Sequence, residues 1–161
     1  MKKTCLLMML VLFTLNAFAQ DAVVAGVKVN QSATKFKNGI VAKKFTKVNE
    51  NVYKGTFAGY SNSLVEVKNT SDGWVDRITV SIPTDGTYDN GKHIAESLIL
   101  AYNKKYGSDY NKFERQEFGN FCHQLCTDDI CFTIYISQDN KTVGVNYVIM
   151  KRDAGINMSD I

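Results

Sequence analysis

The sequence contains very little proline and histidine and none of the common catalytic signatures. Proline occurs once among 161 residues, at Pro83, and histidine twice. A chain with so little proline, many aromatic residues and no low-complexity tract is not typical of a long disordered linker. It has no G-x-S-x-G elbow, H-E-x-x-H helix, phosphate-binding glycine loop or calcium-loop pattern. The sequence therefore favours a folded domain, and it assigns no catalytic, cofactor-binding or metal-binding residue.

The sequence also lacks a hydrophobic run long enough to span a bilayer. Its apolar stretch, Leu6 to Leu15, has 10 residues, whereas a membrane-spanning helix needs about 20. This stretch follows Lys2-Lys3 and precedes Ala17-Phe18-Ala19, which places small residues where a signal peptidase requires them. The pattern predicts a secretory signal peptide over 1–19 and no transmembrane segment after cleavage. We therefore expect a periplasmic or secreted protein.

The charge is small and unevenly distributed. The formal net charge of +3 falls to about +1 when the two leader lysines are removed. One segment holds seven lysines and a single acidic residue, Glu50. The lysines are Lys28, Lys35, Lys37, Lys43, Lys44, Lys47 and Lys54. Such a segment can attract nucleic acid or an acidic partner, but no arginine or glycine repeat accompanies it. We interpret it as a solvated lysine face and expect no nucleic-acid binding.

Alternating apolar and polar residues predict an antiparallel meander in the first half of the chain. The expected strands are 44–49, 52–58, 63–69 and 74–82, with turns at 50–51, 59–62 and 70–73. In the third strand, Val65 and Val67 share one face. In the fourth, the alternation places Trp74 and Ile78 on one side, with Asp76 between them.

The second half begins with a strong helix signal from about Gly91 to Tyr106. Apolar residues recur there every three or four positions: Ile94, Ala95, Leu98, Ile99, Tyr102 and Tyr106. Asp89 or Asn90 is the expected cap, and Gly107 is placed to end the helix. Ser32 is expected to cap a shorter helix through about 36–43. Further strands are expected at 110–121, 130–138 and 142–150.

These elements predict an α+β fold. We expect an antiparallel sheet of about six to seven strands with one long and one short helix packed on one face. The length after the leader suits one domain, 20–150, that buries about two-thirds of its unfolded surface. The polar segment 151–161 is expected to be a flexible tail.

Three cysteines remain once Cys5 leaves with the leader: Cys122, Cys126 and Cys131. Oxidation after export makes a disulfide their default fate. Pairing of 118–122 with 131–135 would place Cys122 near Cys131 and leave Cys126 in the loop. We therefore predict a Cys122–Cys131 disulfide, with Cys126 as a buried thiol or a site of intermolecular pairing.

Two chemical alternatives use the same cysteines. A zinc site would recruit Cys122, His123, Cys126 and Cys131, but adjacent ligands rarely point at one metal and paired two-residue spacings are missing. A thiol nucleophile would need His93 or His123 within hydrogen-bonding reach of a cysteine sulfur. Nothing in the sequence fixes that geometry, so the disulfide remains the preferred reading.

Aromatic residues provide the remaining candidate site. Tyrosine and tryptophan combine a large apolar area with a polar tip, which suits protein-binding surfaces. We expect Tyr53, Tyr60 and Trp74 to contribute to an exposed binding face.

The order of features also carries a resemblance. Val52 to Tyr60, the strand from Trp74 to Pro83, and the helix ending at Tyr102-Asn103-Lys104-Lys105-Tyr106-Gly107 resemble small exported proteins of gut Gram-negative bacteria. These are similar in architecture to the β-lactamase-inhibitor-protein-like fold. The resemblance implies helices on one face of an antiparallel sheet and carries no catalytic residue.

We therefore hypothesise an exported, non-catalytic binding module. It would be an inhibitor-like interaction domain for an unidentified protein of the envelope or extracellular space. A small secreted hydrolase or thiol enzyme, and a glycan- or lipid-binding domain, are the alternatives.

Overall fold

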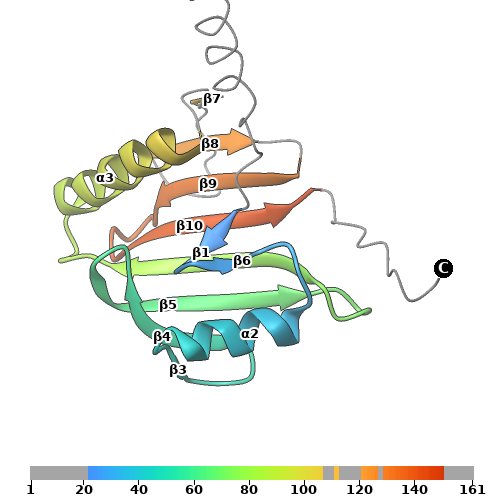
Figure 1. The fold of residues 1–161 in the computed structure, drawn as a ribbon. Helices are drawn as coiled ribbons and strands as arrows, with labels where there is room; N and C mark the ends of the chain where they lie inside the picture. The colour runs from blue at the N-terminus through green and yellow to red at the C-terminus, as the bar shows by residue number, and fades with distance from the viewer. Residues whose placement is uncertain (1–21, 107–110, 113–120, 127–128, 151–161) are drawn as a thin grey trace, which may run out of the picture.

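A long antiparallel sheet with both helices on one of its faces forms the body of the protein (Figure 1). The computed structural model describes residues 22–106, 111–112, 121–126 and 129–150. A small hairpin near the N-terminus lies on the helical face, between the two helices. The predicted α+β class is confirmed. The expected leader at 1–19 and tail at 151–161 lie outside the described residues.

The sheet joins two antiparallel meanders side by side. In chain order the elements are β1 (Val23–Val24), β2 (Val27–Lys28), α2 (Ala33–Ala42), β3 (Thr46–Lys47), β4 (Val52–Phe57), β5 (Tyr60–Asn69), β6 (Val75–Pro83), α3 (Tyr88–Tyr106), β7 (Asn111–Lys112), β8 (Cys122–Cys126), β9 (Ile130–Ile136) and β10 (Thr142–Ile149). The strand order is β3-β4-β5-β6-β10-β9-β8-β7. The two edge strands have only two residues each, so the body of the sheet agrees with the predicted six to seven strands.

The first meander forms where the alternation predicts it, with one difference in phase. Val65 and Val67 are fully buried on β5 as expected. On β6, however, Val75 is buried and Asp76 is exposed. Lys68 pairs with Arg77 and Asn69 pairs with Val75, so Asp76 is the extra residue of a β-bulge. The bulge shifts the alternation by one residue and keeps the carboxylate out of the core.

The turn between β4 and β5 is tighter than predicted. Phe57 pairs with Tyr60, so only Ala58 and Gly59 form the loop. Both have positive φ, 50° and 89°, as a type I′ turn requires. A third positive φ, at Asn62, falls within the register shift between the pairs Phe57–Tyr60 and Gly55–Ser63.

Replacement of Ala58 by asparagine is expected to stabilise the protein. The left-handed conformation is sterically unfavourable for alanine and less so for asparagine. Ala58→Asn should therefore raise the free energy of unfolding by about 0.5–1 kcal/mol. Urea unfolding of the exported protein would measure this gain. The matched change Ala42→Asn, at an exposed position within α2, should instead destabilise, because asparagine is a poorer helix former.

The long helix α3 begins earlier than the sequence indicated. It starts at Tyr88, and Thr87 accepts a hydrogen bond from the Asn90 amide at its side-chain oxygen, 3.3 Å away. The predicted caps, Asp89 and Asn90, therefore lie inside the first turn. Asp85 supports this start because its carboxylate accepts bonds from both the amide and the hydroxyl of Thr87, and these bonds lower the pKa of Asp85. The predicted end at Gly107 lies outside the described residues.

The short helix α2 begins as predicted. The Ser32 hydroxyl accepts a hydrogen bond from the Lys35 amide, 3.4 Å away. Phe36 and Ile40 are fully buried on the face that α2 turns to the sheet. Gly39 lies against β2, where an added Cβ would stand 2.7 Å from Cγ1 of Val27. The glycine that weakens the helix in sequence therefore allows α2 to pack closely on the hairpin.

The core lies between the sheet and its helical cover. Under α3, the rings of Tyr102, Tyr106, Phe132 and Tyr147 form one cluster, with centroid separations of 4.8–6.3 Å. The hydroxyls of Tyr102 and Tyr147 are hydrogen-bonded to each other within the core. The Tyr106 hydroxyl accepts a bond from the amide of Val23, 3.3 Å away, which ties the helix to β1. Every other residue of β9 and β10 therefore faces α3, and the residues between them face the opposite side.

Candidate functional site

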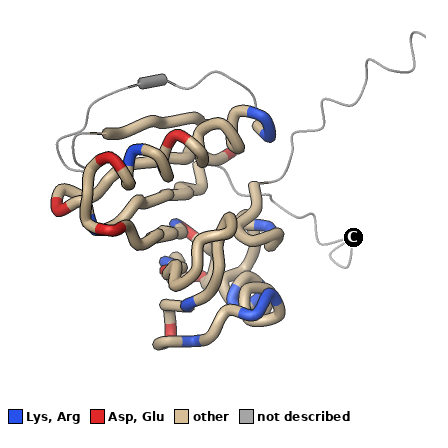
Figure 2. The backbone as a smooth tube through the Cα atoms, turned by 90° about the vertical axis from the view of Figure 1, so that its left-hand side faces the viewer, with Lys and Arg blue, Asp and Glu red and all other residues tan. Residues whose placement is uncertain are grey.

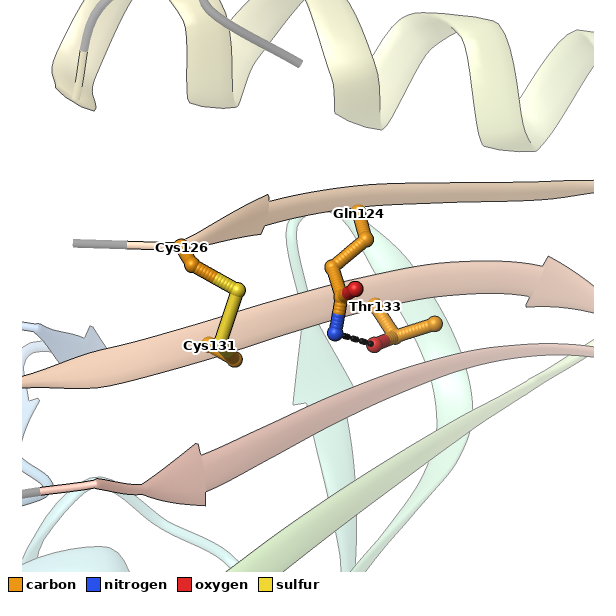
Figure 3. Close-up of a disulfide and its surroundings, with 4 residues drawn as sticks. All are labelled: Gln124, Cys126, Cys131 and Thr133. Carbon is orange, nitrogen blue, oxygen red and sulfur yellow. Dashed lines mark hydrogen bonds between the residues drawn. A yellow bond between two sulfur atoms is a disulfide. The ribbon is translucent and has the colours of Figure 1, made fainter. Parts of the chain in front are cut away.

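The cysteine-rich segment forms a strand rather than the predicted loop. Residues Cys122–Cys126 form β8, which pairs with β9 so that Cys126 stands directly opposite Cys131. These two cysteines form the disulfide, with their Cα atoms 4.0 Å apart (Figure 3). The predicted Cys122–Cys131 pairing is therefore wrong. Cys122 lies four residues earlier on the same face of β8, opposite Tyr135, where it is buried and takes no part in the disulfide.

The disulfide removes two of the four ligands of the zinc alternative. Strand alternation also separates the other two, because Cys122 and His123 point to opposite faces of β8. The His123 ring stacks on Phe121 with centroids 4.7 Å apart. Neither a zinc cage nor a Cys122–His123 catalytic pair is therefore assembled. Across the described ranges, no three His, Cys, Asp or Glu side chains gather as a metal site would require.

A row of polar side chains crosses the face of the sheet opposite the helices. We call this face the outer face. One residue from each of five adjacent strands stands in register, and the row is Glu66, Thr79, Asn146, Thr133 and Gln124. The Thr79 hydroxyl donates to Oδ1 of Asn146 at 2.7 Å, and Nε2 of Gln124 donates to Oγ1 of Thr133 at 3.4 Å. Hydrogen bonds thus satisfy the buried part of the row, whereas Glu66 at its far end is exposed.

The neighbouring row is organised around Tyr135. In register across the strands stand Leu64, Ser81, Gly144, Tyr135 and Cys122. The Tyr135 ring lies over Gly144, since an added Cβ there would overlap Cζ of the ring. Burial, followed by the nearby charges of Glu66 and Cys122, raises the pKa of Tyr135. Its phenol therefore stays protonated at neutral pH.

The third row is cationic at its open end. It runs through Lys68, Arg77, Val148, Cys131 and Cys126. Lys68 and Arg77 are exposed and stand directly opposite each other, an arrangement that costs stability because like charges repel. Neither pairs with a carboxylate among the residues that the structure describes.

The outer face is therefore open on one half and closed on the other. On β5 and β6 the side chains of Leu64, Glu66, Lys68 and Arg77 are exposed, Leu64 to 39%. On β9 and β10 the outward residues Thr133 and Asn146 are buried. We call the open half, made of Lys54, Leu64, Glu66, Lys68, Arg77, Thr79 and Ser81, the open patch. It offers an apolar side chain, hydroxyls and charges of both signs.

The three aromatic residues expected to form a binding face are not brought together. Tyr53 is only 3% exposed and faces the core, so its predicted exposure is wrong. Tyr60 is half-buried against the core at the start of β5. Trp74 is half-buried at the opposite end, beside the α2 cap, where it bridges to Ser32. The length of β5 separates Tyr60 from Trp74 by about 30 Å.

The open patch could not be recognised from the sequence because its members are spread over three strands and no one of them is distinctive by itself. The available signal was the alternation on β5, which places Leu64, Glu66 and Lys68 opposite the buried valines. The residues of β6 that stand opposite them cannot be assigned from the sequence, because the bulge at Asp76 sets the register between the two strands.

Comparisons with protein-family models, with curated proteins and with solved structures found no match. Neither helix of the described part has the length and hydropathy needed to cross a bilayer. A cross-strand disulfide is compatible with export, because such bonds persist in oxidising compartments.

Proposed function

We propose that the protein is an exported binding module that engages a partner protein through the open patch. The observation that carries the proposal is the exposed, directly opposed pair of Lys68 and Arg77. Two cations that stand directly opposite each other on neighbouring strands destabilise the sheet. Such unfavourable arrangements are typical of functional surfaces. A partner carboxylate placed between the two side chains would relieve the repulsion, and Arg77 is suited to bind it in a bidentate way.

The surroundings of this cationic pair support the proposal. Thr79 supplies a hydroxyl in the neighbouring row, and Leu64 with Ser81 opposite it supplies exposed apolar area and a second hydroxyl one row further on. Mixed apolar and polar area of this kind is typical of protein interfaces. The hydrogen-bonded row and the disulfide hold β8, β9 and β10 rigid beside the patch, which limits the entropy lost on binding. The resemblance to small exported proteins with an inhibitor-like fold agrees with such a role.

Site-specific photo-crosslinking in the producing cell tests this function. A crosslinking amino acid at Lys68 or Thr79 should capture one protein of the envelope or medium. The same amino acid at Glu96 or Leu100, exposed on α3, should not capture it. Equal capture from both sets, or none from the outer face, would remove the basis of the proposal.

Substitution then measures what the cationic pair contributes. With the captured partner purified, Arg77→Ala should weaken binding about tenfold, because interface arginines are common hot spots. The matched variant Lys105→Ala, at the exposed C-terminal end of α3, should change binding less than twofold. Similar losses for both variants would show that the effect is general charge and not recognition at the open patch.

A further inference from the structure

A second surface, at the edge of the sheet under α2, combines lysines with exposed valines. It comprises Lys37, Val41 and Lys44 at α2 and its end, and Lys47 and Val48 at the hairpin between β3 and β4. We call it the basic flank. Figure 2 shows lysines gathered around α2 and this hairpin, whereas α3 carries both acidic residues and lysines. The two helices cover opposite halves of the sheet, so the basic flank is confined to the half that α2 covers.

The members of the basic flank lie along one side of α2. Lys37 and Val41 lie one helical turn apart on α2, and Lys44 follows just beyond the end of the helix. Nζ of Lys37 donates to Oδ1 of Asn51, in the turn between β3 and β4, at 2.8 Å. The opposite side of α2 is occupied by β2, where Gly39 meets Val27. The lysines of helix and hairpin therefore belong to one continuous surface.

Two apolar side chains protrude from this surface. Val41 is 51% exposed and Val48 is 57% exposed. The lysines beside them, Lys44 and Lys47, are exposed as well. Cationic heads on flexible stems around protruding apolar side chains are typical of surfaces that rest on a bilayer.

The backbone at Lys44 supplies an independent observation. Its φ is +68°, in the left-handed region where glycine normally ends a helix. Lysine at this position is unfavourable for folding. Glycine at position 44 would therefore relieve this backbone strain, so the lysine charge can be removed there without a loss of stability.

We propose that the basic flank binds the surface of a bilayer containing anionic lipids, with Val41 and Val48 entering the interface. Nucleic-acid sites rely on arginine forks and aromatic stacking, and the basic flank has neither. Lysines act as point charges without a fixed fork, which suits a diffuse layer of phosphate headgroups. Because the open patch lies on the outer face of β5 and β6, a protein resting on its basic flank keeps that patch free for a partner.

Vesicle binding tests the proposal with protein purified after export, its N-terminus read by mass spectrometry. Vesicles of phosphatidylcholine that also contain phosphatidylglycerol should bind the protein, and vesicles of phosphatidylcholine alone should not. Each lysine near such a surface contributes about fivefold to affinity, so Lys44→Gln with Lys47→Gln should weaken binding about 25-fold. The matched pair Lys104→Gln with Lys105→Gln, exposed at the end of α3, removes the same charge and should change binding less than twofold.

Two further variants separate the contributions of charge, apolar contact and folding. Lys44→Gly should raise the urea midpoint, because glycine suits a φ of +68°, and should still weaken vesicle binding about fivefold. Val41→Ser with Val48→Ser should weaken the binding that persists when salt screens the lysines.

Three outcomes would overturn the proposal. Equal losses from the two lysine pairs would show a general charge effect, and equal binding to both kinds of vesicle would show that anionic lipid is not recognised. Release from vesicles by millimolar inorganic phosphate, or by DNA that binds more tightly than the vesicles, would assign the basic flank to a discrete phosphate or to another polyanion.

Discussion

Gly144→Ala is expected to destabilise the protein by about 1–3 kcal/mol. The added Cβ would occupy the space now taken by the Tyr135 ring, so the ring must leave the surface of β10. Its departure exposes apolar area of the ring and of the strand beneath it. The Tyr135 hydroxyl also loses its place beside the polar row, so the change disturbs the part of the outer face that supports the open patch.

The same substitution should change sign when the ring is absent. In a Tyr135→Ala background, Gly144→Ala is expected to be neutral or to stabilise by up to about 1 kcal/mol, because alanine loses less backbone entropy than glycine in a strand. Urea unfolding of the four proteins in this cycle measures the coupling between the two positions. Equal effects in both backgrounds would show that the ring does not lie over Gly144.

Local chemistry explains which elements the sequence predicted. The Ser32 cap, the apolar stripe of α3 and the alternation of β5 each depend on residues close in sequence. The start of α3 was misplaced because Asp89 and Thr87 are both good caps, and the structure uses Thr87. The phase of β6 was predicted correctly from Ile78 onward and incorrectly before it, because the bulge at Asp76 has no signal in its own strand.

The candidate sites depend on contacts that local patterns do not determine. Thr79 and Asn146 are hydrogen-bonded although 67 positions separate them in the sequence. They are in contact because β10 pairs with β6, although α3, β8 and β9 lie between these strands in the chain. No local sequence pattern determines the register in which β10 pairs with β6. The open patch and the polar row beside it therefore appear only in the folded chain, whereas the lysines of the basic flank were visible in sequence without their geometry.

The cysteines show the same limit at short range. The segment Cys-His-Gln-Leu-Cys reads as a loop, because it mixes polar residues with cysteines and has no β-branched residue. Its pairing with the strongly apolar β9 makes it a strand. The register of that pairing places Cys126 directly opposite Cys131. A register four residues away would have been needed for the predicted pairing.

Loss of the Cys126–Cys131 disulfide is expected to lower the free energy of unfolding by about 2 kcal/mol. The two cysteines are five positions apart, and even a small closed loop removes entropy from the unfolded chain, by about this amount in the loop-closure estimate. The double variant Cys126→Ala with Cys131→Ala should show the loss in urea unfolding. The matched variant Cys122→Ala leaves the bond intact and removes only the buried thiol, so it should retain the sensitivity of the protein to reductant.

Alkylation in denaturant without reductant checks the same bond and the predicted export together. A protein cleaved near Gln20 should carry one label, on Cys122, because Cys126 and Cys131 are joined. A chain that keeps its leader should carry a second label, on Cys5. Peptide mapping that finds the label on Cys126 would contradict the structure and restore the Cys122–Cys131 pairing.

Because the bond closes β8 onto β9 at the end of the cationic row, its reduction should also loosen the rigid half of the outer face. Partner binding through the open patch should then fall in step with the thiol count.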